Sequence, residues 1–225
     1  RPLHVCIDND TGARPHLGLT QADVVYEYLM ERFYNTRFTA VYWGQEAERI
    51  GPMRSVRLVN LELAPQYDAL MACQGGSNGT LWNILHDERA AYYEFFEYTY
   101  VWMDMNFATG YFTIYGKHSN PQVGTNLTET STNLLRKWLT ANGKEKTVKV
   151  PGFTFSPAGS AAPQAMAAAS VSIPYPSECC AVQWTYDPAS QRYLRTMNGE
   201  AHVDAATKER VSAANVIVVY ATYDV

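Results

Sequence analysis

The stretch LHVCIDNDTG, residues 3–12, contains the pattern that decides the fold. Its first five residues form a mostly apolar run of strand length, and the polar residues after them are typical of a turn-rich loop. We therefore predict a buried strand that ends in this loop. Residues 38–43 and 69–73 are two further strand-like runs. The N-terminal half is thus expected to supply several strands to one sheet.

Between the first two strands, the sequence has the pattern of an amphipathic helix. Thr20 and Asp23 resemble a helix start, and Val25, Leu29 and Phe33 repeat every four residues. The acidic residues between them repeat with the same spacing on another face. We predict a helix here.

Other segments of the first 150 residues also have helical patterns. One follows Gly51-Pro52 and is ended by Pro65, and two more cover residues 79–88 and 128–141. Strands that alternate with helices favour a sheet with helices packed on it. We therefore expect residues 1–150 to form an α/β domain with a mixed sheet covered by helices.

The chain changes character after residue 150. Residues 151–176 are rich in proline, glycine and alanine, which indicates a long loop or linker. Beyond it, residues 182–186 and 192–197 flank a turn, and residues 215–222 resemble a final strand. We expect residues 177–225 to be an antiparallel β part that is cut short at its end. The protein as a whole is expected to be α+β.

The composition excludes several classes of protein. Of the 225 residues, 47% are hydrophobic and 18% are charged, which suits a chain with a sizeable core. The net charge is −4 and no stretch concentrates lysine and arginine, so we expect no nucleic-acid partner. The longest aliphatic run, residues 216–219, is far too short to span a bilayer. The first residue is not methionine, so we expect a trimmed chain whose compartment cannot be read from a missing signal peptide.

The four cysteines are Cys6, Cys73, Cys179 and Cys180, and none has the spacing of a metal site. We expect no metal and no other cofactor. Cys6 and Cys73 lie in strand-like runs, where we predict buried thiols rather than a disulfide. For Cys179-Cys180, two unpaired thiols are favoured over a strained ring between neighbours.

Several motifs resemble one known family. They include ADVVYE at residues 22–27, IGPMRSVR at 50–57 and GGS at 75–77, with NVIV at 215–218 near the end of the chain. Together they are similar to the YerB-like family of bacterial lipoproteins, a domain of unknown function, although residues 90–175 match poorly. The resemblance implies an extracytoplasmic protein, anchored to the membrane by a lipid in its full-length form, with no established reaction or ligand.

The motif GPMRSVR, residues 51–57, is the strongest candidate for a binding site. A rigid turn before a helix leaves backbone N–H groups pointing outward, and two guanidinium groups accompany them, which is how proteins hold anions. A structural alternative is that Arg54 and Arg57 pair with the acidic residues Asp23, Glu27 and Glu31.

Further polar residues fall at or near predicted strand ends and loops, where ligands gather in open sheets. We predict a binding module for an anionic envelope component or a protein partner. The residues of this predicted site are Asp8, Asn9, Arg14, Arg37, Arg54, Ser55, Arg57 and Ser77.

An alternative function follows from GGSNG at residues 75–79, which fits the G-x-S-x-G motif of serine hydrolases. Ser77 would be the nucleophile, His118 or His202 the base, and Asp104 or Asp187 the acid. The structural alternative is a glycine turn in which Ser77 caps a helix.

Two more patterns have a structural and a functional interpretation. Aromatic residues crowd residues 92–115, and we favour burial over a glycan-binding or protein-binding surface. His202 and Asp204 would lie on one face of an extended segment, but two ligand-type side chains do not make a metal site. We therefore favour a solvated hairpin for this pair.

Overall fold

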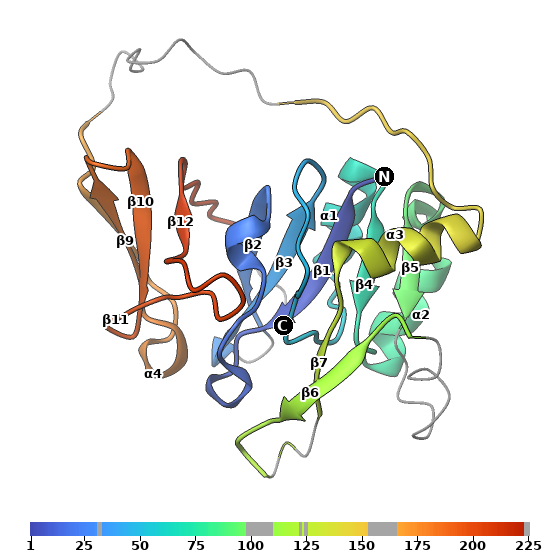
Figure 1. The fold of residues 1–225 in the computed structure, drawn as a ribbon, viewed down its shortest axis with the longest axis horizontal. Coiled ribbons are helices and arrows are strands. Elements are labelled where there is room, and N and C mark those ends of the chain that lie inside the picture. The colour runs from blue at the N-terminus through green and yellow to red at the C-terminus, as the bar shows by residue number, and fades with distance from the viewer. Residues whose placement is uncertain (31–32, 98–109, 122, 124–125, 153–165, 223–225) are drawn as a thin grey trace.

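The computed structural model describes the chain except for residues 31–32, 98–109, 122, 124–125, 153–165 and 223–225 (Figure 1). None of the helices in the described parts is both long and apolar enough to cross a membrane.

A five-stranded mixed sheet forms the centre of the N-terminal part. Its strands are β1 (Leu3–Asp8), β2 (Val24–Leu29), β3 (Thr36–Tyr42), β4 (Leu70–Cys73) and β5 (Glu94–Glu97). The order across the sheet is β2-β3-β1-β4-β5. β3 is antiparallel to both β1 and β2, whereas β1, β4 and β5 run parallel. The predicted mixed sheet is confirmed.

Helices cover both faces of this sheet, as Figure 1 shows. On one face, α1 (Asn60–Tyr67) and α2 (Asn78–His86) enclose a cluster that contains Cys6 and Met71. On the other face, α3 (Thr132–Ala141) inserts Leu135 and Leu139 into the larger cluster. The hairpin of β6 (Thr113–Lys117) and β7 (Asn126–Glu129) leads into α3. Short 3-10 turns are η1 (Thr11–Ala13), η2 (Leu19–Gln21) and η4 (Glu88–Tyr92).

The C-terminal part is an antiparallel sheet that lies beside β2 (Figure 1). Its elements are β8 (Ser170–Ile173), α4 (Ser177–Cys180), β9 (Val182–Asp187), β10 (Arg192–Met197), β11 (Glu200–Ala201) and β12 (Ser212–Ala213). Val211 belongs to the same core cluster as β1 and β3, and Trp184 packs against it. The two parts therefore share a core.

The helix predicted after Thr20 is wrong, because this segment forms strand β2. All six residues of β2 pair with β3, from Val24 opposite Val41 to Leu29 opposite Thr36. A four-residue repeat is also a multiple of the two-residue period of a strand. The spacing of Val25 and Leu29 was therefore compatible with both structures, and pairing with β3 decided between them.

Other boundaries differ more mildly from the predictions. Pro65 lies inside α1. The segment 128–141 begins as the end of β7 and becomes helical only at Thr132, where Ser131 caps the helix by accepting from Leu134 N. Strand β8 lies within the predicted linker. The described residues of the predicted strand 215–222 form no strand, and Ile217 and Tyr220 are exposed.

Both predictions about the cysteines are wrong, because the structure contains two disulfides. Cys6 and Cys73 are joined across the adjacent strands β1 and β4, with their Cα atoms 4.9 Å apart. Their separation of 67 residues hid this pairing, since only the register of β1 on β4 brings them together. Cys179 and Cys180 form a disulfide between neighbours in α4.

Candidate functional site

The predicted binding motif lies at the carboxyl ends of β1 and β4. Its extended backbone inserts between these two strand ends: Arg54 N donates to Cys6 O at 2.9 Å, and Gln74 N donates to Arg54 O at 2.8 Å. One step further, Val56 N donates to Gly75 O at 2.8 Å. Strands β3 and β2 lie on one side of β1, and β4 and β5 lie on its other side. Residues 51–57 therefore lie where the strand order reverses, which is where open sheets commonly bind ligands.

Three arginines meet at this edge, and we call Arg37, Arg54 and Arg57 the arginine cluster. Arg54 Nε forms an ion pair with Asp8 Oδ2 at 3.0 Å. Arg37 lies opposite Asp8 in the register of β1 and β3, and its Nη1 donates to Ser55 O at 2.7 Å. The fold thus brings together five of the eight predicted site residues, which are Asp8, Arg37, Arg54, Ser55 and Arg57.

Arg37 is the most buried member of the cluster, with 4% of its surface exposed. Burial, and next the charge of Arg57, lower the pKa of Arg37 to about 10. Its Nε atom has no hydrogen-bond partner among the described residues. Arg57 is half-buried, and its Nη1 donates to Val56 O at 2.9 Å. The cluster therefore places cations close together in a partly desolvated position.

Tyr115 adds a side chain that the sequence did not single out for this site. Its hydroxyl is buried and has no hydrogen-bond partner among the residues that the structure describes. Burial, and next the charge of Glu129, raise the pKa of Tyr115, and Asp8 contributes in the same direction. Tyr115 lies on β6 of the separate β6–β7 hairpin, so only the placement of this hairpin in the fold could have revealed it as a neighbour.

Asn9 and Arg14 make their described hydrogen bonds outside the arginine cluster. Asn9 Nδ2 donates to Thr36 Oγ1 at 2.7 Å. Arg14 Nη2 donates to Asn9 O at 2.9 Å and to Cys179 O at 2.7 Å. Arg14 therefore links the loop after β1 to the C-terminal part.

The candidate residues for a hydrolase have separate partners. Ser77 is exposed and caps α2, with its Oγ accepting from Thr80 N at 3.2 Å. His118 Nε2 contacts Asp10 Oδ1 at 3.1 Å, and its Nδ1 accepts from Asn120 N. Among the described residues, no hydrogen bond links Ser77 to His118 or His202. Asp187 binds the turn residue Ser190, and Asp104 lies outside the described residues.

The acidic residues that the sequence suggested as partners of Arg54 and Arg57 have other contacts where the structure describes them. Glu27 binds Arg195 of the C-terminal part, with its Oε2 2.9 Å from Arg195 Nη2. Asp23 Oδ2 accepts from Trp43 N at 2.6 Å and from Gly44 N at 2.9 Å. Glu31 lies outside the described residues. Asp8 is the carboxylate that contacts Arg54.

A buried polar network crosses between the two parts, and we call Glu27, Arg195, His202 and His16 the interface network. Arg195 Nη1 lies 2.6 Å from His202 Nδ1, and His202 Nε2 lies 2.8 Å from His16 Nδ1. His16 Nε2 is 2.9 Å from the carbonyl oxygen of Asp8. Glu27 and His202 were singled out for other roles, but sequence spacing could not reveal their connection, because members of this network lie up to 186 residues apart.

Asp204 completes the contact between the parts. It is fully buried, and its carboxylate accepts from Gly18 N at 3.1 Å and from Thr20 N at 3.0 Å. The prediction of a solvated hairpin for His202 and Asp204 is wrong, because both side chains are buried against the N-terminal part. Among the described residues, no group of three or more histidine, cysteine or acidic side chains could hold a metal ion.

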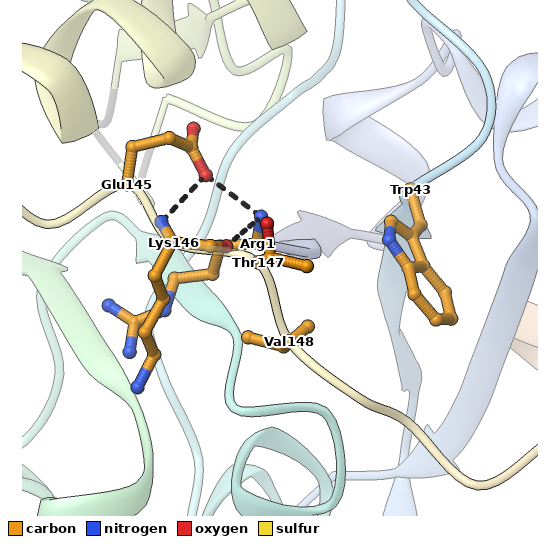
Figure 2. Close-up of a pocket in the computed structure, with 6 residues that line it drawn as sticks. All are labelled: Arg1, Trp43, Glu145, Lys146, Thr147 and Val148. Atoms are coloured by element: carbon orange, nitrogen blue, oxygen red, sulfur yellow. Dashed lines mark hydrogen bonds and ion pairs between the residues drawn. The ribbon is translucent and has the colours of Figure 1, made fainter.

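A pocket of 490 Å³ lies at the opposite end of β1 (Figure 2). Trp43 forms one wall, and Arg1 with residues 145–148 forms the other. The charged groups there already have partners: Arg1 binds Asp68, as does Lys146 through its Nζ. The polar atoms that line this pocket therefore give no sign of a missing ligand.

The aromatic segment is mixed in its exposure. Tyr93 and Phe112 are buried, as the sequence favoured, whereas Tyr92 is exposed. Tyr98 lies outside the described residues, and Tyr115 is half-buried.

Comparisons with known proteins agree with the motifs. The N-terminal domain of the family "Protein of unknown function (DUF3048)" matches residues 1–103, and the C-terminal domain of that family matches residues 171–225. Over 79 residues, 35% of this chain, the sequence is 39% identical to "Putative lipoprotein YerB" of Bacillus subtilis (strain 168), and the match spans 24% of that protein.

A solved structure has the same fold. The crystal structure of the YerB protein from Bacillus subtilis is similar with a TM-score of 0.71 and 22% identity, over 94% of this chain. The chain spans 66% of that solved chain, so a substantial part of YerB has no counterpart here.

Proposed function

Because the chain belongs to the DUF3048 family, the YerB-like proteins of unknown function, we propose that it is an extracytoplasmic binding module for an anionic component of the cell envelope. In the full-length protein, a lipid would anchor it to the membrane. The name of the Bacillus subtilis relative includes the word lipoprotein, which supports this location. The two disulfides also suit an oxidising compartment outside the cytoplasm.

The observation that carries the proposal is the environment of Arg37. This guanidinium is buried, its Nε has no described partner, and the like charge of Arg57 acts on it more strongly than the opposite charge of Asp8 does. A bound anion would offset this repulsion and could accept from nitrogen atoms at the same edge. Guanidinium groups bind phosphate and carboxylate with paired hydrogen bonds, so the proposed ligand carries one of these groups.

Thermal unfolding in the presence of anions tests the proposal. Inorganic phosphate, sulfate and acetate are each added to the parent protein and to the double variant Arg54→Gln/Arg57→Gln. An anion at ten times its Kd stabilises the folded state by about 1.4 kcal/mol, which raises Tm by about 3–6 °C in a protein of this size. We expect this rise in the parent protein and its loss in the double variant.

Arg192→Gln is the matched control, since Arg192 is exposed on β10 and binds Ser212 within the C-terminal part. It should keep the full response to anions. If no anion raises the Tm of the parent protein, or if the double variant responds as the parent does, the arginines serve the fold and the proposed site is wrong.

A further inference from the structure

The hydrogen bonds of the interface network run in one direction, because arginine can only donate. His202 Nδ1, 2.6 Å from Arg195 Nη1, must therefore accept. The proton of neutral His202 is then on Nε2, which donates to His16 Nδ1 at 2.8 Å. His16 in turn carries its proton on Nε2 and donates to Asp8 O at 2.9 Å. Both imidazoles fit this arrangement only when they are neutral.

The surroundings of the two imidazoles also oppose a positive charge. His16 and His202 are 1% and 5% exposed, and the ring of Phe38 lies against both. The cations Arg195 and Arg14 face them, while the nearby carboxylates are those of Asp8, Glu27 and Asp204. Burial, then Arg195 and Arg14, lower the pKa of His16 to about 3. Burial, then His16 and the same two arginines, lower the pKa of His202.

We propose that the interface network is an acid-sensitive latch, in which protonation of His16 or His202 releases the C-terminal sheet from the N-terminal part. A proton on His202 Nδ1 would point at the guanidinium of Arg195. A proton on His16 Nδ1 would point at the N–H of His202. Either proton would remove one hydrogen-bond acceptor from the interface network and would add a positive charge beside Arg14 and Arg195.

The direction of the pH dependence follows from where the protons bind. Once the parts separate, each histidine regains an ordinary pKa of 6.5, so the released state takes up protons that the docked state excludes. Docking is therefore at full strength above this pH and weakens as the pH falls below it. Each histidine lowers the docking constant by up to about tenfold per pH unit, so the two together lower it by up to about a hundredfold per pH unit.

Hydrogen exchange at the interface measures this release. The amide of Ala205 donates to His16 O across the junction, whereas the amide of Leu70 donates to Pro2 O inside the N-terminal part. After correction for the intrinsic exchange rate, we expect the protection factor of Ala205 to fall steeply between pH 7 and pH 5. That of Leu70 should change far less.

Substitutions separate the latch from other effects of acid. In the double variant His16→Gln/His202→Gln, each amide can still accept and donate but cannot titrate. We expect the protection factor of Ala205 in this variant to change by less than about threefold over the same pH range, once the change at Leu70 has been subtracted. His4→Gln is the control, because His4 is also buried but lies on β1, packed against Tyr67.

The idea is overturned if Ala205 keeps its protection at pH 5 in the parent protein, or loses it equally in the double variant. Should the double variant fail to fold, imidazole nitrogen NMR of the parent protein decides. At pH 7, His16 and His202 must both be neutral with the proton on Nε2. A proton on Nδ1 of either ring contradicts the proposed run.

Discussion

The interface network and the arginine cluster each contain a buried guanidinium group, yet they satisfy it in opposite ways. Arg195 uses one Nη atom on Glu27 and the other on His202, so its charge meets a carboxylate at 2.9 Å. Arg37 donates to a backbone carbonyl, has an unpartnered Nε among the described residues, and lies near the like charge of Arg57. A satisfied network is typical of structure, whereas an under-satisfied one is typical of a position kept for a ligand.

Replacing arginine by methionine should have the largest effect on the free energy of unfolding at Arg195, in the interface network. This change leaves the carboxylate of Glu27 without its cation in a largely buried position. We expect the free energy of unfolding to fall by about 3–5 kcal/mol, measured by urea denaturation. Arg192→Met, at an exposed position of the same strand, should cost less than about 1 kcal/mol.

Adding Glu27→Leu to Arg195→Met should recover much of this loss, because the two charges then disappear together. If Arg195→Met alone proves nearly neutral, the network contributes little to stability and the contrast between the two regions fails.

Ser77→Ala should have a smaller effect. The substitution removes the cap that accepts from Thr80 N at the start of α2, which costs about 1 kcal/mol of unfolding free energy. The response of Tm to anions should stay unchanged, since the proposed site depends on the arginines. A fluorophosphonate probe should leave Ser77 unlabelled in the folded protein. Labelling that disappears in the variant would instead support a hydrolase.

The smallest effect on stability is expected for Arg37→Met. Among the described residues Arg37 forms no ion pair, and the nearby Asp8 is paired with Arg54. Replacing this cation by an apolar side chain of similar length should therefore change the free energy of unfolding by less than about 1 kcal/mol, or raise it. The response to phosphate should be lost at the same time. A loss as large as that of Arg195→Met would mean that Arg37 is already fully paired, and would place both arginines in the same structural role.

Local patterns in the sequence predicted three of the five strands of the central sheet, β1, β3 and β4, and the stop of α3 at Asn142-Gly143. They did so because apolar runs, caps and glycine turns act over a few neighbouring residues. Strand β2 was missed because its four-residue spacing fits two periods, and only its partner β3 could decide. In the candidate site, too, the sequence revealed what neighbouring residues form together and missed the contacts between distant residues.

Residues 51–57 were recognised as a unit since they are contiguous, and the structure places them beside Asp8 and Arg37. Pairings such as Arg195 with Glu27 depend on how two sheets meet, which the spacing of residues along the chain does not encode.

The disulfide between Cys6 and Cys73 has a practical consequence for anyone who produces this protein. It closes a loop between residues 67 apart, and the chain-entropy model gives such a cross-link a stabilisation of about 4 kcal/mol. Material made in a reducing cytosol would be a dithiol that lacks this contribution. Secretion into an oxidising compartment, or oxidative refolding, would be needed before the stabilities and pH responses described above are compared.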